Sequence, residues 1–176
     1  MTTSHALLAL LRAFIGICAL RLGPQDLPPS SALLALTTLS YFALSVIGYG
    51  LQTAIAYPLL KALLEIAVLF AATYALLFVM SYGRRLRQTL TALMGCGTVI
   101  TAAALVSMVV ARALPQVLGL ALLSAITLLN LLVTAHILRQ AVSTWFMVGV
   151  LFAFGYELLV SKLFMIADAL LSAAPA

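Results

Sequence analysis

The chain has 176 residues, of which 65% are hydrophobic and only 7% charged, and its formal net charge is +5. Soluble domains carry about 45–50% apolar and about 25% charged residues, so this composition excludes a soluble globular fold. The apolar runs are also much longer than the alternating segments, about ten residues each, of a membrane β-barrel. We therefore predict an all-α membrane protein with five transmembrane helices and an N-terminal interfacial amphipathic helix.

Residues 1–29 are predicted to form that N-terminal helix and a Pro-rich linker. The apolar stretch 6–22 is interrupted by Arg12 and closed by Arg21. A spanning helix needs about 20 residues, and an arginine at mid-membrane costs roughly 2.5–3.5 kcal/mol on insertion scales. We expect this helix to lie in the membrane interface, with both arginines at lipid headgroups. A short inserted helix is the alternative.

Residues 30–170 are predicted to form the transmembrane domain, followed by a short tail at 171–176. Ser30 or Ser31 is suited to cap the first helix, because its hydroxyl can accept a hydrogen bond from a free amide of the first turn. The connections between apolar runs are short, so successive helices are expected to be antiparallel neighbours. The predicted spans are 32–51, 59–82, 89–111, 117–138 and 141–164.

The basic residues predict the orientation. Cytoplasmic loops are enriched in Lys and Arg, and one choice of sides places six basic residues inside and three outside. This choice puts the N-terminus in the cytoplasm and the C-terminus in the periplasm of a bacterial inner membrane. The six inner residues are candidate headgroup contacts, and because they lie at segment ends we expect a lipid bilayer rather than a nucleic acid as partner. They are Arg12, Arg21, Arg84, Arg85, Arg87 and Arg139; Lys61, Arg112 and Lys162 lie outside.

A cluster of charges is predicted within the outer half of the bundle. Glu65 follows Lys61 by one helical turn on the second span, so the two share a helix face and are expected to pair. Glu157 and Lys162 are expected at similar depth on the fifth span. Acids within a membrane are candidate proton or cation ligands. The alternative is a structural ion-pair cluster that locks the two helices together.

Other polar residues give weaker signals. His136, with Asn130 above it, is interpreted as an interfacial anchor, and Tyr57, Tyr82 and Trp145 as an aromatic belt. Small residues recur at spacing four and predict close helix packing, within the chain or against a homo-oligomeric or other membrane-protein partner. These stripes are Ala67, Ala71 and Ala75; Ala92 and Cys96; Ala121 and Ala125; Gly149 and Ala153.

No catalytic, cofactor or metal site is predicted. Cys18 and Cys96 form no CxxC motif, so a disulfide framework or a metal centre is not expected. The chain carries none of the common hydrolase, metalloprotease or nucleotide-binding motifs. We therefore do not expect an enzyme.

The part of the chain from Arg84 onward resembles the Yip1-type membrane domain of many small bacterial proteins. The resemblance rests on the basic loop that enters an apolar helix at residues 87–93, on the segment 128–139, and on the closing helix from Trp145. It implies five spans behind a cytoplasmic N-terminus and a role in membrane organisation, and it implies no catalytic residue.

Two functions follow as hypotheses. The first is a non-enzymatic scaffold or accessory subunit that acts through helix–helix contacts. The second is a small ion-coupled transporter or channel that uses Glu65 and Glu157. The two differ in whether these acids are paired and dry or face a wet cavity.

Overall fold

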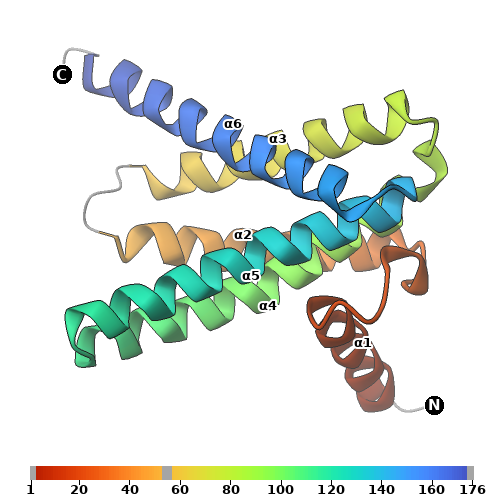
Figure 1. Ribbon diagram of the computed structural model, residues 1–176, viewed down its shortest axis with the longest axis horizontal. Helices are drawn as coiled ribbons and strands as arrows, with labels where there is room; N and C mark the ends of the chain where they lie inside the picture. Colours follow the sequence, from red (N-terminus) through yellow and green to blue (C-terminus); the bar gives the residue numbers. More distant parts are fainter. Residues whose placement is uncertain (1–2, 53–56, 174–176) are drawn as a thin grey trace.

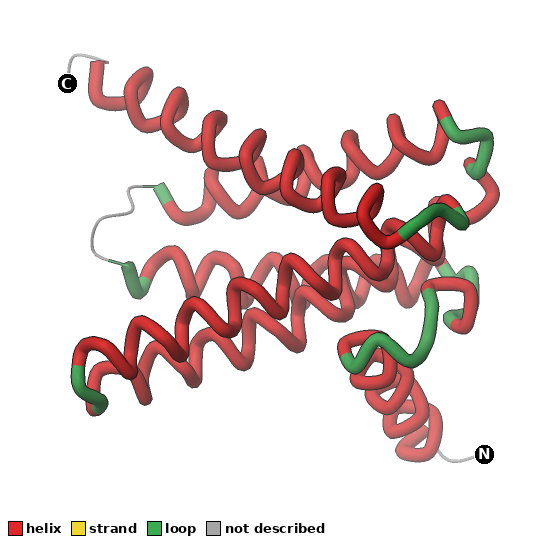
Figure 2. The backbone as a smooth tube through the Cα atoms, in the orientation of Figure 1, coloured by secondary structure: helices red, strands yellow, loops and turns green. Residues whose placement is uncertain are grey.

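The computed structural model describes residues 3–52 and 57–173, and within these ranges the chain is helical with no strand (Figures 1 and 2). Most of the turn expected between the first two spans, residues 53–56, and the end of the predicted tail, 174–176, lie outside the described residues. The elements are α1 (Thr3–Cys18), η1 (Pro24–Asp26), α2 (Ser31–Gly50), α3 (Pro58–Val79), η2 (Gly83–Arg85), α4 (Leu86–Ala113), α5 (Gln116–Val142) and α6 (Phe146–Ala173).

Five of these helices, α2 to α6, are long and apolar enough to cross a membrane, which fits a multi-pass membrane protein. The number of long apolar helices thus equals the number of predicted spans, but several predicted ends were wrong. Helix α4 begins at Leu86, inside the stretch predicted as a basic loop. Helix α6 begins only at Phe146 and continues to Ala173, well past the predicted end at 164.

The five long helices form an up-and-down bundle. The α3–α4 and α5–α6 connections and the linker before α2 lie at one end, which we call the arginine end; the α4–α5 connection and the C-terminus lie at the other (Figure 1). Helix α4 packs most extensively against α2 and α5, and α6 packs against α5. Helix α3 packs against α2 and makes smaller contacts with α4 and α6.

Helix α1 is shorter than predicted because it ends in a left-handed turn. Leu20 has φ 60°, and the amides of Leu20 and Arg21 donate back to the carbonyls of Ile17 and Gly16. This pattern is a Schellman motif, which satisfies the last carbonyls of a helix. With 16 residues α1 is also shorter than the about 20 that a spanning helix needs.

Helix α1 lies obliquely against the bundle near the arginine end (Figure 1). Phe14 is buried against α4, where the absence of a side chain at Gly95 makes room for its ring. The two free cysteines meet at this contact, since the side chain of Cys18 on α1 interacts with that of Cys96 on α4. Nothing in the sequence predicts this contact, because the two cysteines are far apart in the chain.

The linker between α1 and α2 is tied to the bundle by side chains. His136 on α5, predicted to be an interfacial anchor, is buried and its Nε2 donates to the carbonyl of Leu22 at 2.9 Å. Gln88 on α4 donates to the carbonyl of Leu27 at 2.7 Å. Ser30 caps α2 by accepting from the amide of Leu33, as predicted. These bonds fix where α2 begins relative to α4 and α5.

The small-residue stripes divide into two kinds. Ala92, Cys96 and Ala153 are buried, and Gly149 lies against the backbone of α5, so these stripes pack within the chain. The other two stripes are exposed on the surface of the bundle: Ala67, Ala71 and Ala75 on α3, and Ala121 and Ala125 on α5.

Candidate functional site

Glu65 is held by two tyrosines rather than by a base. Tyr41 donates its hydroxyl to Oε1 of Glu65 at 2.6 Å, and Tyr49 donates to Oε2 at 2.9 Å. Both tyrosines come from α2, whereas Glu65 lies on α3 about two turns after its start. Each carboxylate oxygen thus accepts a hydrogen bond from a neutral donor, and the charge of the carboxylate is left uncompensated.

Glu65 and its tyrosines line a polar pocket of about 140 Å³ between α2, α3 and α4. A water molecule occupies about 30 Å³ in the liquid, so the pocket has room for several waters. Helix α4 contributes its wall opposite Glu65. The lining residues are Tyr41, Ser45, Gly48, Tyr49, Gln52, Glu65, Thr101, Ala104, Leu105 and Met108.

A polar stripe in the sequence of α2 indicates this pocket, although the sequence analysis above assigns it no role. Tyr41, Ser45, Tyr49 and Gln52 recur at spacings of four, four and three, so they lie along one face of an otherwise apolar helix. We had assigned no role to Tyr41 and Tyr49. A polar stripe of this kind predicts a helix face that meets a polar partner, and here the partner is Glu65.

Gly97 on α4 positions Tyr41. A Cβ atom added at Gly97 would lie 2.8 Å from Cε2 of Tyr41, a distance that real Cβ atoms essentially never show. The glycine therefore lets the tyrosine ring pass close to the α4 backbone. Thr98, the next residue, donates to the carbonyl of Met94 at 2.7 Å and lies 3.4 Å from that of Thr37, which ties α4 to α2 near the same level.

The predicted pair of Lys61 with Glu65 was wrong. Lys61 is buried, and its Nζ atom lies 2.8 Å from Oδ2 of Asp168 on α6. The predicted fifth span ends at 164, so the sequence analysis places Asp168 beyond that span. The i, i+4 spacing puts Lys61 and Glu65 on one face, but their side chains turn to different helices, Lys61 to α6 and Glu65 to α2.

An aromatic contact joins this salt bridge to the polar pocket. The Nζ atom of Lys61 lies 5.5 Å from the ring centroid of Phe164, within the range of a cation–π contact. Phe164 in turn meets Tyr49 edge to face, with ring centroids 5.6 Å apart. The salt bridge, Phe164 and Tyr49 therefore form a continuous chain of contacts from Lys61 to Glu65.

Glu157 lies deeper than predicted. The Lys61–Asp168 contact sets the register of the antiparallel helices α3 and α6, so Phe164 is level with Glu65 and Glu157 lies about two turns further toward the arginine end. The expected match in depth failed because α6 continues past 164. Asn130 on α5 donates to Oε1 of Glu157 at 3.2 Å. The two acids are nevertheless close enough to interact electrostatically with each other and with Tyr156.

The remaining predicted cluster member, Lys162, is exposed on α6 and makes no salt bridge within the described ranges. In 3–52 and 57–173 the one salt bridge is Lys61–Asp168, so neither Glu65 nor Glu157 is paired with a base. The predicted cluster residues thus find partners on different helices: Lys61 on α6, Glu65 on α2 and Glu157 on α5. Among the same residues, no group of three His, Cys, Asp or Glu side chains is placed to hold a metal ion.

The candidate headgroup arginines fall into two groups. Arg12, Arg21, Arg84 and Arg87 are exposed. Arg85 instead donates through Nη1 to the carbonyls of Gln140 and Ala141, and so caps the end of α5. The guanidinium of Arg139 lies over the ring of Phe146, 5.5 Å from its centroid. Arg85 and Arg139 therefore serve the α5–α6 corner of the bundle, a role that the sequence did not indicate.

Comparisons of the chain with protein-family models, with curated proteins and with solved structures found no match.

Proposed function

We propose that this chain is a small ion-coupled membrane transporter in which Glu65 reversibly binds a proton or a small monovalent cation. One observation carries the proposal: a carboxyl group without a basic partner faces a polar pocket inside a bundle of helices long enough to span a bilayer. The volume of the pocket beside Glu65, and the absence of a basic partner for Glu65 in the described chain, favour this function over a structural ion-pair cluster.

The energetic argument concerns the charged form of Glu65. Several kcal/mol are needed to remove an ion from water into a protein interior, and an ionisable residue within the membrane costs about 2.5–3.5 kcal/mol on insertion scales. Two tyrosine hydroxyls offset part of this cost, but they bring no positive charge. A proton or cation bound at Glu65 removes the remaining charge. The site is thus built to take up and release a positive ion.

We further propose that the protein lies in a bacterial inner membrane with its N-terminus in the cytoplasm, and that α1 lies in the inner interface. The exposed arginines near the arginine end support this orientation. The Lys61–Asp168 salt bridge then lies on the periplasmic side of Glu65.

Infrared difference spectroscopy of the reconstituted protein tests ion binding directly. A pH step, or an exchange of Na⁺ for a bulky organic cation, should produce a carboxyl signal in the wild type. Glu65→Gln should remove that signal and leave the melting temperature close to wild type, because glutamine can still accept from the tyrosines. Asp26→Asn is the control, since Asp26 is exposed in the linker before α2 and does not line the pocket.

Two results would overturn the proposal. One is a Glu65 signal that responds to neither pH nor Na⁺, which would leave the carboxyl group as a fixed structural element. The other is a wild-type difference spectrum that survives Glu65→Gln unchanged, which would place the titrating group elsewhere.

A scaffold function remains the second candidate, and the exposed stripe of Ala67, Ala71 and Ala75 favours it. Small residues on an exposed helix face let a second helix approach closely. The role in membrane organisation that the Yip1-type resemblance implies would use such a surface. A single cysteine at Ala71 should then form a specific crosslink to a second copy or to another membrane protein in native membranes, and a cysteine at the exposed Leu151 on α6 should not.

A further inference from the structure

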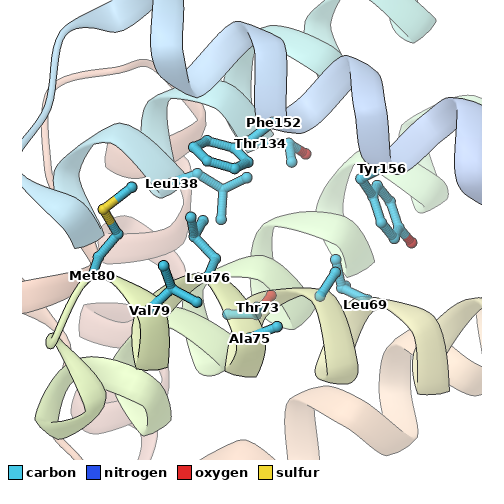
Figure 3. Close-up of a pocket in the computed structure, with 11 residues that line it drawn as sticks. Leu69, Thr73, Ala75, Leu76, Val79, Met80, Thr134, Leu138, Phe152 and Tyr156 are labelled. Atoms are coloured by element: carbon cyan, nitrogen blue, oxygen red, sulfur yellow. The ribbon is translucent and has the colours of Figure 1, made fainter.

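An apolar pocket of about 290 Å³ lies between α3, α5 and α6, toward the arginine end from Glu65 (Figure 3). Leu76, Val79 and Met80 line one end of it, and Phe152 lies across from them on α6. Tyr156 and Leu69 form the opposite end, and the Tyr156 hydroxyl points away from Met80 (Figure 3). The few polar groups in the lining are the hydroxyls of Thr73, Thr134 and Tyr156.

Two acidic residues, Glu157 and Glu65, lie near the Tyr156 end of this pocket without lining it. Glu157 follows Tyr156 in the chain, and the register of α3 and α6 puts Glu157 level with Ala72, which lines the pocket. Tyr156 also interacts electrostatically with Glu65. The pocket is therefore apolar along its length and adjoins two carboxyl groups, neither of which has a basic partner in the described chain.

We infer that the substrate is a lipophilic organic cation, with its apolar body in this pocket and its positive charge at the Tyr156 end, near Glu157 and Glu65. The inference rests on the proposed function and names the substrate class for it. A bound cation would exchange with the proton or small cation at Glu65, because the two positive charges compete for the same pair of acids. Such competition is the simplest coupling between an ion and a substrate.

The size of the pocket and the charge of the nearby acids both favour a lipophilic organic cation. Pockets for small organic molecules typically measure about 300–1,000 Å³ and combine an apolar lining with a few convergent polar groups. An organic anion would meet two acids, and like charges brought together in an interface cost several kcal/mol. A lipid acyl chain would fill the apolar part but would leave the acids unpaired. Only a cation satisfies both parts of the site.

Binding of radiolabelled tetraphenylphosphonium to the protein in lipid nanodiscs tests the inference, with tetraphenylborate as the anion of the same shape. We expect saturable binding of the cation and none of the anion. Glu157→Gln should weaken binding at least tenfold. Ala72→Trp should weaken it similarly because the indole fills the pocket. Ala71→Trp is the matched control, since Ala71 is exposed and does not line the pocket.

The outcomes separate this inference from the proposed function. Equal binding of the cation and the anion, or cation binding that Ala72→Trp leaves unchanged, would overturn the inference and would leave the infrared result at Glu65 untouched. A Glu65 signal that responds to pH while tetraphenylphosphonium fails to bind would likewise refute only the substrate class. If Ala72→Trp does not fold, Thr134→Phe, which fills the pocket from α5, takes its place and should likewise weaken cation binding at least tenfold. Unchanged binding in that variant would overturn the inference.

Discussion

At Glu65 the choice of tyrosine over lysine as partner decides what the carboxyl group can do. A lysine would fix the carboxylate in its charged form and close the site to other cations. A tyrosine hydroxyl can donate to a carboxylate and can also accept from a protonated carboxyl group. Tyr41 and Tyr49 can therefore hold Glu65 in both states, which a reversible ion site requires.

We predict that Tyr41→Phe and Tyr49→Phe each destabilise the charged form of Glu65. A hydrogen bond to a charged group contributes about 1.5–3 kcal/mol, so the midpoint of the Glu65 infrared titration should move by about one to two pH units. Loss of a donor disfavours the carboxylate, so the midpoint should move upward. Tyr74→Phe is the control, because Tyr74 is exposed and far from the pocket lining. A midpoint that both pocket variants leave in place would show that the tyrosines do not stabilise the carboxylate.

The Lys61–Asp168 salt bridge is asymmetric, and its two ends should respond differently to substitution. The side chain of Lys61 is 4% exposed and that of Asp168 is 47% exposed. We predict that Asp168→Asn destabilises the protein more than Lys61→Met, because it leaves a buried ammonium group without a partner, which can cost about 3–5 kcal/mol. Lys61→Met replaces that group with an apolar chain of similar length.

Thermal unfolding in detergent, followed for both single variants and for Lys61→Met/Asp168→Asn, measures this difference. The double variant should be more stable than Asp168→Asn alone. Equal losses from the two single changes, with additive loss in the double variant, would mean that the contact contributes little and that burial of Lys61 is compensated by Phe164.

At the scale of the helices, α4 organises the site through a glycine. Gly97 lets the Tyr41 ring approach the α4 backbone, and Gly95 makes room for Phe14 of α1 on the same helix. These two glycines, two residues apart on α4, thus make room for the side chains of two different helices. One locates the tyrosine of the ion site and the other locates α1 against the bundle.

We predict that Gly97→Val disturbs the ion site, whereas Gly95→Val disturbs only the packing of α1 against α4. The added side chain at Gly97 would displace Tyr41, so the midpoint of the Glu65 titration should move upward, as in Tyr41→Phe. At Gly95 the clash is with Phe14, so protease sensitivity of the linker before α2 should rise and the Glu65 titration should stay unchanged. If both variants shift the titration equally, the two helix contacts are coupled rather than separate.

Which helices exist could be predicted from the sequence, because each requires only a long apolar run. Where they end could not always be predicted. The last predicted span ends at 164, but α6 continues to Ala173 and carries Asp168, the partner of Lys61. Helix α1 was predicted to reach Leu22, and the left-handed turn at Leu20 ends it sooner. A charge that finds a partner on another helix, or a non-glycine residue with positive φ, has no local sequence signal.

Only part of the candidate site could be predicted, again because contacts between helices have no local sequence signal. Glu65 and Glu157 were identified because charge within an apolar run is visible in one dimension. Their partners Tyr41, Tyr49 and Asn130 lie on other helices, and the rotation and register of those helices are set by packing. The i, i+4 pairing of Lys61 and Glu65 was a local inference that tertiary contacts overrode. Only the polar stripe on α2 was available in the sequence as evidence of the true arrangement.

For the molecule as a whole, the orientation in the membrane determines which side of the ion site each solvent reaches. The α3–α4 connection carries Arg84 and Arg85 with Arg87 just inside α4, and we place it in the cytoplasm. The α4–α5 connection lies at the opposite end of the bundle (Figure 1). A cysteine in each connection therefore reports on opposite sides of the membrane.

We predict that a membrane-impermeant maleimide applied to intact bacterial cells labels Gln116→Cys but not Gly83→Cys, each in a variant with Cys18 and Cys96 replaced by Ser and Ala. Both positions tolerate the change, since Gln116 is exposed and a Cβ atom at Gly83 meets nothing within 4 Å. Permeabilised cells should label at both, which controls for reactivity. Labelling of Gly83→Cys alone in intact cells would invert the bundle. The Lys61–Asp168 salt bridge would then lie on the cytoplasmic side of Glu65, and the apolar pocket would lie toward the periplasmic leaflet.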